Sequence, residues 1–352
     1  MKKITQRQLI IFYCIYSFAI KFLLLPQLLT RGSGNDAWIS ALIGTVIELL
    51  VLWMVLGVMT ANKDKDIYQA RGAKIVMPLM LLVFLLQIMI LTKQSFYLLG
   101  ENMFENLSAF MFIIPMLLLG IFFCFTSTQS IFRSGEIFYV FLAVGIAVSV
   151  LPALGQINAR EALPLFSSGM RPILTTTLIN LIYFESASFL LMFSGEIKIE
   201  ENFKKRFMAV ATAVGVFFVF FVFMFWSLFA GVSSAKNVAV ANMTGYSSIV
   251  ASGGRTGWIL VAVWLLLLLL RFGVTFYCAF KSTKYITGLK NRAGIISVTL
   301  ALVVFLLSSF VFTGLREMQL FITNMRWVIL GLYIVIPVLF FVFGFTRRNR
   351  DV

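Results

Sequence analysis

The chain has 352 residues, of which 61% are hydrophobic and only 12% are charged. Soluble globular domains contain about 45–50% apolar and about 25% charged residues, so this composition excludes a water-soluble fold. The net charge of +15 could indicate nucleic-acid binding, but the basic residues stand in short clusters between apolar runs, which is typical of membrane topology. Because the sequence has no His, histidine-based zinc sites, Ser-His-Asp triads and histidine proton relays are excluded.

Ten apolar runs are each long enough to cross a bilayer as a helix, which takes about 20 residues. They lie at about 9–30, 38–60, 75–99, 109–128, 136–154, 173–195, 207–230, 257–280, 293–313 and 318–345. They are too long for the strands of an outer-membrane barrel, which have about ten residues of alternating polarity. We therefore expect an all-α integral membrane protein. Residues 1–352 would form one transmembrane domain with two five-helix repeats, at about 9–154 and about 173–345.

Lys and Arg residues are distributed unevenly between the two sides of the predicted membrane domain. The side that carries both termini has 19 of them, the other side has six, and four lie within the runs. Because basic loops stay in the cytoplasm, both termini are expected there. The longer outer connections, at about 155–172 and 231–256, could each form a lid over a central site, or could simply bridge distant helix ends.

Charged residues near the middle of the first and sixth runs are the main indication of a binding site. Lys21 and Glu185 hold these positions, where a charge costs at least about 2.5–3.5 kcal/mol on insertion scales. The two runs would be equivalent members of inverted repeats, and transporters interrupt such helices to form their sites. We predict that Lys21 and Glu185 face each other as a coupled pair. The alternatives are a purely structural ion pair or a Lys21 side chain that reaches toward the interface.

Other polar residues within the runs complete the predicted site. The third run carries Gln87, Lys93 and Gln94 on neighbouring turns, and the eighth carries Arg271 and Thr275, so each helix should turn a polar stripe inward. The candidate ligand-binding residues are Ser17, Ala19, Lys21, Gln87, Tyr183, Glu185, Ser186, Arg271 and Thr275. Weaker candidates are Glu48, Asn324 and Arg326; simple pairing, for example of Glu48 with a basic neighbour, would explain these better.

Four short motifs make the sequence resemble the spore germination permease family, the B subunits of nutrient germinant receptors in endospore-forming bacteria. They are Ile4-Thr5 with Gln8, Leu25-Pro26, Asp36-Ala37-Trp38-Ile39-Ser40 at the head of the second run, and Phe193-Ser194-Gly195-Glu196 at the end of the sixth. The likeness extends over the whole chain. Read without the family, Asn35 or Asp36 would simply cap the second helix.

The resemblance implies a member of the amino acid–polyamine–organocation transporter superfamily, with the leucine-transporter-like fold of two inverted five-helix repeats and with helices 1 and 6 interrupted. It implies a multi-pass protein of the endospore inner membrane that is assembled with an A-type and a lipoprotein C-type subunit. The B subunit would hold a small nutrient, often an amino acid, between helices 1, 3, 6 and 8. Neither a cofactor nor a metal is implied, and no nucleic acid is expected as a partner.

The sequence departs from amino acid permeases of that superfamily at the break of helix 1. These permeases have small residues there, usually Gly, whose N–H groups bind a carboxylate. Here the stretch from Ser17 to Lys21 has no Gly, so Lys21 could supply the positive charge instead. Because Lys21 and Arg271 place fixed positive charge in helices 1 and 8, where this fold often binds sodium, we expect a response that does not depend on sodium.

A ligand-sensing receptor subunit is therefore the leading function, and a secondary transporter of amino acids or organic cations is the alternative. A membrane-embedded enzyme finds little support, because histidine is absent and no span carries a pair of aspartates at its middle. A flippase for lipid-linked sugars usually has more spans than ten, so it ranks lower.

Overall fold

The first predicted span is a broken helix. α1 (Gln6–Lys21) begins at a capping box, in which Thr5 and Gln8 exchange hydrogen bonds between side chain and backbone, and it ends at the predicted charge. Residues 22–24 form a turn, after which α2 (Leu25–Ser33) continues outward. The predicted interruption of this span is confirmed.

The sixth predicted span is also broken. It consists of α7 (Met170–Ile179), the 3-10 helix η4 (Leu181–Phe184) and α8 (Ala187–Met192). Glu185 has an extended backbone and Ser186 is also non-helical, so this pair separates η4 from α8. Both predicted interruptions are therefore real, and each takes backbone groups out of the helical hydrogen-bond pattern in the interior.

The computed structural model describes residues 3–61, 72–102, 108–236, 238–246, 256–289, 291–311 and 314–344. The remaining elements are η1 (Gly34–Asp36), α3 (Ala37–Ala61), α4 (Ala73–Asn102), α5 (Ala109–Phe125), α6 (Thr128–Leu154), η3 (Ala159–Ala162), η5 (Ser194–Glu196), α9 (Phe203–Phe229), η6 (Ala230–Ala235), α10 (Ala239–Tyr246), α12 (Thr256–Thr287), α13 (Ala293–Leu306), the π-helix η7 (Leu307–Val311), α14 (Leu315–Asn324) and α15 (Arg326–Gly344). Within these ranges the one β-type pairing is an isolated bridge between Ile4 and Ile197. The predicted all-α class is confirmed.

Six helices of the described chain are long and apolar enough to cross a bilayer by themselves, and the pair α14 and α15, bent by 64°, makes a seventh if it is one span. Helix is present in each of the ten predicted runs. The broken first and sixth spans and the short α5 do not pass the length criterion on their own. The count of ten spans and the inverted repeat therefore remain predictions.

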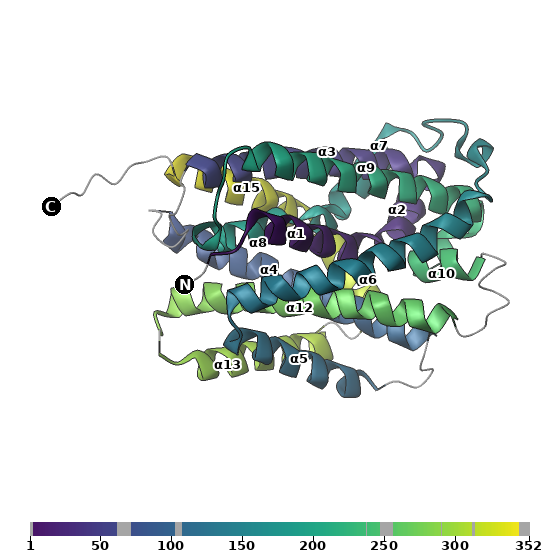
Figure 1. Cartoon of the computed structure of the whole chain (residues 1–352). Helices are drawn as coiled ribbons and strands as arrows, with labels where there is room; N and C mark the ends of the chain where they lie inside the picture. The colour runs from purple at the N-terminus through teal and green to yellow at the C-terminus, as the bar shows by residue number, and fades with distance from the viewer. Residues whose placement is uncertain are drawn as a thin grey trace.

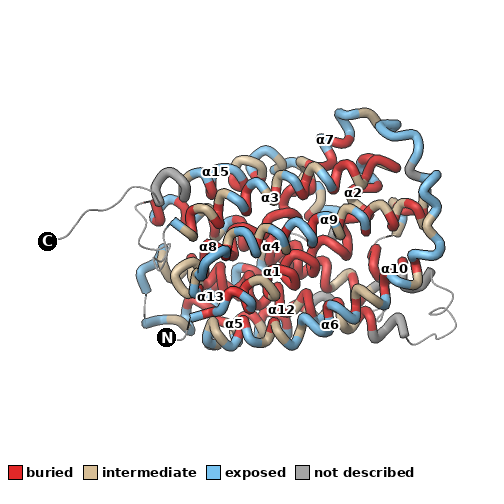
Figure 2. The backbone as a smooth tube through the Cα atoms, turned by 45° about the horizontal axis from the view of Figure 1, so that its top comes forward, coloured by how far each residue is buried: buried red, intermediate tan, exposed pale blue. Residues whose placement is uncertain are grey.

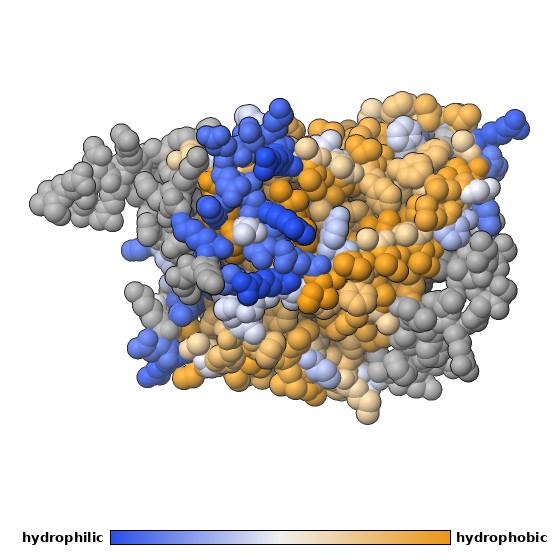
Figure 3. Space-filling view, in the orientation of Figure 1, coloured by the Kyte–Doolittle hydropathy of each residue, from blue (hydrophilic) through white to orange (hydrophobic). Residues whose placement is uncertain are grey.

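The long helices lie side by side in one bundle, with α4 packed along α12 and α3 packed along α9 (Figure 1). α1 runs through the interior and is almost wholly buried, whereas many residues of α5 and α6 are exposed (Figure 2). The exposed residues of these two helices include large apolar ones such as Phe122 and Val140. Apolar side chains cover the visible flank of the bundle, and hydrophilic ones gather at the end where α1 begins (Figure 3). This distribution suits a bilayer around the flank, and it leaves the two helix breaks in a buried centre.

Candidate functional site

Lys21 forms its ion pair with Glu48 of α3 and not with Glu185, so the predicted Lys21–Glu185 pair is wrong. Both side chains are almost completely buried, at 1% and 2% exposure. Gly44 explains the partner, because a Cβ atom there would lie only 2.5 Å from the Phe184 ring. Without a side chain at Gly44, α3 approaches the helix breaks closely, and Glu48 lies one turn further along the same face. The pairing of Glu48 with a basic neighbour is confirmed.

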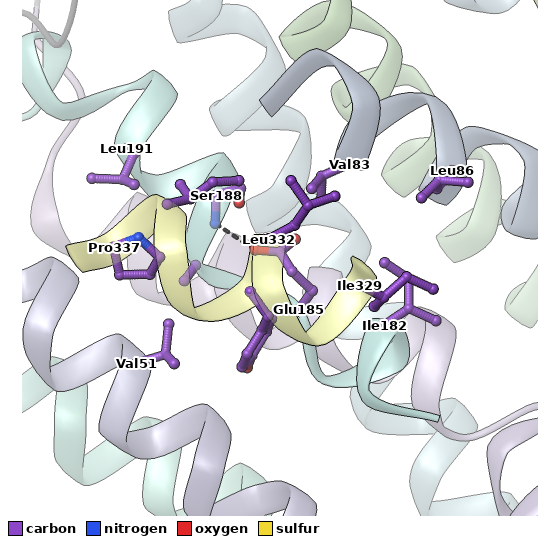
Figure 4. Close-up of a pocket in the computed structure, with 13 residues that line it drawn as sticks. Val51, Val83, Leu86, Ile182, Glu185, Ser188, Leu191, Ile329, Leu332 and Pro337 are labelled. Carbon is purple, nitrogen blue, oxygen red and sulfur yellow. Dashed lines mark hydrogen bonds between the residues drawn. The ribbon is translucent and has the colours of Figure 1, made fainter. Parts of the chain in front are cut away.

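Glu185 belongs to a second cluster that is centred on Gln87 of α4. The Gln87 amide donates to the Glu185 carboxylate and, at 3.1 Å, to its main-chain carbonyl. The backbone N–H of Ser188 donates to the same carboxylate at 2.7 Å, as the dashed line in Figure 4 shows. The Gln87 carbonyl oxygen accepts from the Tyr16 hydroxyl at 2.6 Å and from the Arg271 guanidinium at 3.4 Å. Gln87 thus connects Glu185, at the break of the sixth predicted span, with Arg271 of α12, which is the eighth predicted span.

Arg271 joins α12 to α1. Its guanidinium donates to the main-chain carbonyl of Tyr16, and its central carbon lies 3.8 Å from the centroid of the Tyr16 ring, which is cation–π geometry. Thr275, one turn further on, lies 3.3 Å from the Tyr16 hydroxyl. A fixed cation therefore occupies the contact between the first and eighth predicted spans.

The Glu48 cluster and the Gln87 cluster meet at Glu185–Ser186, the break of the sixth predicted span. The Ser186 hydroxyl donates to the Glu48 carboxylate at 2.5 Å, while the neighbouring Glu185 belongs to the Gln87 cluster. Two basic and two acidic side chains thus balance one another in the interior. Such groups are stabilised only when their partners stay in place, since each is costly to bury alone.

The space beside Glu185 is too small for a nutrient molecule. A cavity of about 10 Å³ adjoins this carboxyl group, with Ser188, Leu332 and Tyr333 in its wall (Figure 4). This volume is close to the minimum of about 10–15 Å³ for a single water. A ligand can therefore enter this site only if the helix breaks move apart or if it replaces the internal polar contacts.

Three other predicted site residues, Ser17, Ala19 and Tyr183, do not join the two clusters. Ser17 and Ala19 are fully buried in α1, but the structure joins neither side chain to the two clusters. Tyr183 is buried too, yet it lines a different cavity, whose wall includes residues of α2, α7 and α14. The site around Gln87 therefore contains Glu185, Arg271 and Thr275 of the predicted set, whereas Lys21 and Ser186 belong to the Glu48 cluster.

Of the weaker candidates, Glu48 is the partner of Lys21, whereas Asn324 and Arg326, like Lys93 and Gln94 of the third run, lie outside both clusters. Lys93 is buried and donates to the carbonyl of Ser308 at 3.0 Å, where α13 passes into the π-helix η7. Gln94 is buried beside it. Asn324 is the last residue of α14 and Arg326 is the first residue of α15, so both flank the bend between these helices. The Arg326 guanidinium lies 5.8 Å from the Trp327 ring.

Sequence reasoning missed three residues that contact the site. Tyr16 and Ser188 lie within the polar stretches that drew attention to Lys21 and Glu185, so their neighbours gave a usable signal. Tyr333 donates its hydroxyl hydrogen to the Phe184 carbonyl at 2.9 Å, which satisfies a backbone group of the helix 6 break. It stands alone in an apolar run, and nothing in the sequence distinguishes it.

Asp36 does not cap α3, which corrects the prediction for this motif. Its carboxylate is fully buried and accepts hydrogen bonds from the backbone N–H groups of Phe166 and Ser168, at 2.8 and 2.9 Å. Asn35 beside it donates to the Pro164 carbonyl at 2.8 Å. The motif therefore fastens the connection between α6 and α7 to the junction of α2 and α3.

Replacing Asp36 with Ala is expected to lower the free energy of unfolding by about 1.5–3 kcal/mol or more, because hydrogen bonds to charged groups contribute this much and two N–H donors lose their acceptor. Thermal unfolding of the purified protein in detergent measures the change. Glu161→Ala in the same connection is the control, since Glu161 is exposed and should have little effect. Equal stability of the two variants would show that Asp36 does not hold this connection.

The second predicted lid is described only in part, because residue 237 and residues 247–255 lie outside the described chain. The part that is described covers the break in helix 1. The N–H of Ala239, at the start of α10, donates to the carbonyl of Leu23 at 2.9 Å. The amide of Gln27 donates to the carbonyl of Ser234, also at 2.9 Å. This connection thus satisfies backbone and side-chain groups of the first broken span.

Two of the motifs lie together at the end of the bundle where α1 begins. The N–H of Ile4 donates to the Glu196 carbonyl at 2.8 Å, and the N–H of Lys198 donates to the Ile4 carbonyl at 3.0 Å. The Glu196 carboxylate pairs with Lys281 of α12, whose ammonium group also reaches the Met192 carbonyl at 3.2 Å. The motifs therefore tie the first, sixth and eighth spans together at one end.

A solved structure shares this fold. It is that of Mhp1, a nucleobase-cation-symport-1 family transporter in a closed conformation with bromovinylhydantoin bound. The TM-score is 0.61 with 15% sequence identity, and the match covers 96% of this chain and 78% of Mhp1. The chain therefore shares the fold of this multi-pass membrane protein.

Sequence comparison gives the family. A curated relative from Bacillus subtilis (strain 168), named "Putative spore germination protein YfkT", is 26% identical over 187 aligned positions, and the match covers 49% of this chain and 50% of the relative. The chain thus matches about half the length of that protein. A family described as "Spore germination protein" matches residues 3–316, which is most of the chain. The chain belongs to the spore germination protein family of membrane permeases.

Proposed function

We propose that the chain is the nutrient-binding subunit of a spore germinant receptor and that its ligand is a small zwitterion such as an amino acid. The supporting observation is the position of Gln87, which links Glu185 to Arg271 between the two broken helices. A free amino acid carries an ammonium group that suits Glu185 and a carboxylate that suits Arg271. Binding would exchange the neutral bridge for a charged one.

The small cavity beside Glu185 makes binding and movement inseparable in this proposal. The nutrient must displace Gln87 from at least one partner, and the half-helices around residues 22–24 and at Glu185–Ser186 must separate to admit it. A ligand shifts a conformational equilibrium only by its difference in affinity for the two states. The closed centre provides that difference, and partner subunits would detect the shift.

The proposal includes the topology that the sequence favours: ten spans in two inverted repeats, both termini in the cytoplasm, and assembly with A-type and lipoprotein C-type subunits in the endospore inner membrane. The 19-to-6 distribution of basic residues supports this orientation. A cysteine at Val232, which is 60% exposed, should react with an impermeant thiol reagent added from outside, while a cysteine at Glu200 should not. The reverse pattern would contradict the orientation.

A secondary transporter is the second candidate, supported by the fold shared with Mhp1. Reconstituting the chain in proteoliposomes separates the two functions. As a receptor subunit, it should bind a radiolabelled germinant amino acid without concentrating it inside the vesicles. Accumulation of the amino acid against its gradient would favour the transporter.

The same vesicles test ion dependence. Because the Arg271 guanidinium already donates to the Tyr16 carbonyl, a sodium ion at the contact of helices 1 and 8 would lie beside a fixed positive charge. Replacing sodium with choline at constant ionic strength should leave binding unchanged. An increase of tenfold or more in the dissociation constant on sodium removal would overturn this expectation.

A further inference from the structure

A second cavity lies at the outer side of the helix 6 break, between α2, α7 and α14. Its volume is about 170 Å³, so it is far roomier than the space beside Glu185. The wall is largely apolar, but six of its residues carry polar side chains: Arg31, Thr176, Asn180, Tyr183, Gln319 and Thr323. Among the lining residues Arg31 is the only charged one, so the described wall is positive and otherwise neutral.

The walls of this cavity are held in a fixed arrangement. A Cβ atom on Gly32 would lie 2.2 Å from the Thr176 hydroxyl oxygen, so α2 and α7 touch at a position that only glycine permits. Asp36 and the hydroxyl of Ser168, which donates to the Ser33 carbonyl at 2.8 Å, fasten the end of α2 to the segment just before α7. The cavity is therefore a built feature of the outer half of the bundle.

Tyr183 of η4 lines this cavity next to the break of the sixth span. It is 1% exposed, it lines the cavity, and its hydroxyl has no hydrogen-bond partner in the described structure. Burying a hydroxyl without a partner is unfavourable, and a ligand that supplies an acceptor would recover that free energy. Tyr183 stands two residues before Glu185, so a ligand that moved its ring would also act on the helix 6 break.

We propose that this cavity is an outer binding site for small molecules that carry a carboxylate. The Arg31 guanidinium binds the carboxylate, because its planar group of N–H donors matches two carboxylate oxygens, and Asn180 and Gln319 supply neutral polar contacts. A nutrient would first bind in this cavity, next to Tyr183, and would then move to the central site at Gln87. Only one part of this inference rests on the proposed function, namely that the molecule bound in the cavity is the nutrient.

Charge-selective labelling tests the site and does not require that the nutrient be identified. Thr323→Cys places a thiol in the wall, and the native cysteines Cys14, Cys124 and Cys278 are buried, so the unmodified full-length protein gives the baseline. The purified protein is treated with an anionic methanethiosulfonate, the sulfonatoethyl reagent, and with the cationic trimethylammonium-ethyl reagent. The measured quantity is the ratio of the two labelling rates.

The anionic reagent should react faster, and Arg31→Gln should lower the rate ratio at least threefold, while Arg31→Lys, which keeps the charge, should lower it less. Acetate and L-alanine should slow labelling, whereas ethylamine should not. Gln156→Cys, on an exposed turn that is not part of the cavity wall, is the matched control whose ratio should not change with Arg31→Gln.

An unchanged ratio in Arg31→Gln would overturn the proposal, as would equal protection by ethylamine and acetate. Protection by chloride equal to that by acetate at the same ionic strength would overturn the carboxylate assignment in favour of a general anion site. Failure of the proposed germination function would appear elsewhere, as a nutrient response that is indifferent to Glu185, and would leave these labelling rates unchanged.

Discussion

Lys21→Ala and Glu48→Ala, each made alone, are expected to reduce the amount of folded protein severely. Each substitution leaves the other charge buried without its partner, which typically costs about 3–5 kcal/mol, a large part of the stability of an ordinary protein. The pair is buried at 1% and 2% exposure, so water cannot readily replace the missing partner. Protein abundance in the membrane fraction of the producing cells and thermal unfolding in detergent both measure the loss.

The double variant Lys21→Met, Glu48→Leu should recover most of that loss, because apolar replacement of a complete buried pair is often tolerated. A double-mutant cycle should therefore show a strong interaction between Lys21 and Glu48. The cycle between Lys21 and Glu185 should show a smaller one, since Lys21 is paired with Glu48 and Glu185 is bonded to Gln87. Strictly additive effects of Lys21 and Glu48 on abundance would contradict the ion pair.

Glu185→Gln is expected to raise the nutrient concentration for half-maximal germination at least tenfold while the protein remains abundant. Glutamine has nearly the same shape and can still accept the hydrogen bond from Ser188, but it lacks the charge that would bind the ammonium group of the nutrient. A hydrogen bond to a charged group contributes about 1.5–3 kcal/mol, and every 1.4 kcal/mol changes affinity about tenfold. Germination rate against nutrient concentration is the measurement.

Two further substitutions serve as comparisons for Glu185→Gln. Glu161→Gln changes an exposed carboxyl of the outer connection and should respond like the parent protein. Arg271→Lys keeps the positive charge but loses the flat guanidinium that lies 3.8 Å from the Tyr16 ring. It should therefore weaken the germination response even though the charge is unchanged. A Glu185→Gln variant with the parent's dose response would exclude this carboxyl from nutrient binding.

Composition and run length are sufficient to predict the helical membrane class, because apolar helices of bilayer length have few alternatives. The positions of the breaks were also predictable. A charge in the middle of an apolar run is costly, so Lys21 and Glu185 had to lie where other chain segments could satisfy them. The same reasoning selected Gln87, Arg271 and Thr275, which the structure brings together at one site.

Partner choice could not be predicted in the same way. Lys21 and Glu185 hold equivalent positions in the predicted repeats, but the approach of α3 at Gly44 decides that Glu48 is the partner of Lys21. Asp36 similarly reads as a helix cap, because the loop that it binds is more than a hundred residues away in sequence. Contacts of this kind depend on packing between distant segments, which residue spacing does not reveal.

The most direct test of the central claim is equilibrium binding of the radiolabelled germinant amino acid to the purified receptor complex, with the parent chain and with Glu185→Gln. If the nutrient binds between Glu185 and Arg271, the substitution should raise the dissociation constant at least tenfold in complexes of equal subunit content. An unchanged dissociation constant would contradict the claim and place the nutrient elsewhere in the receptor.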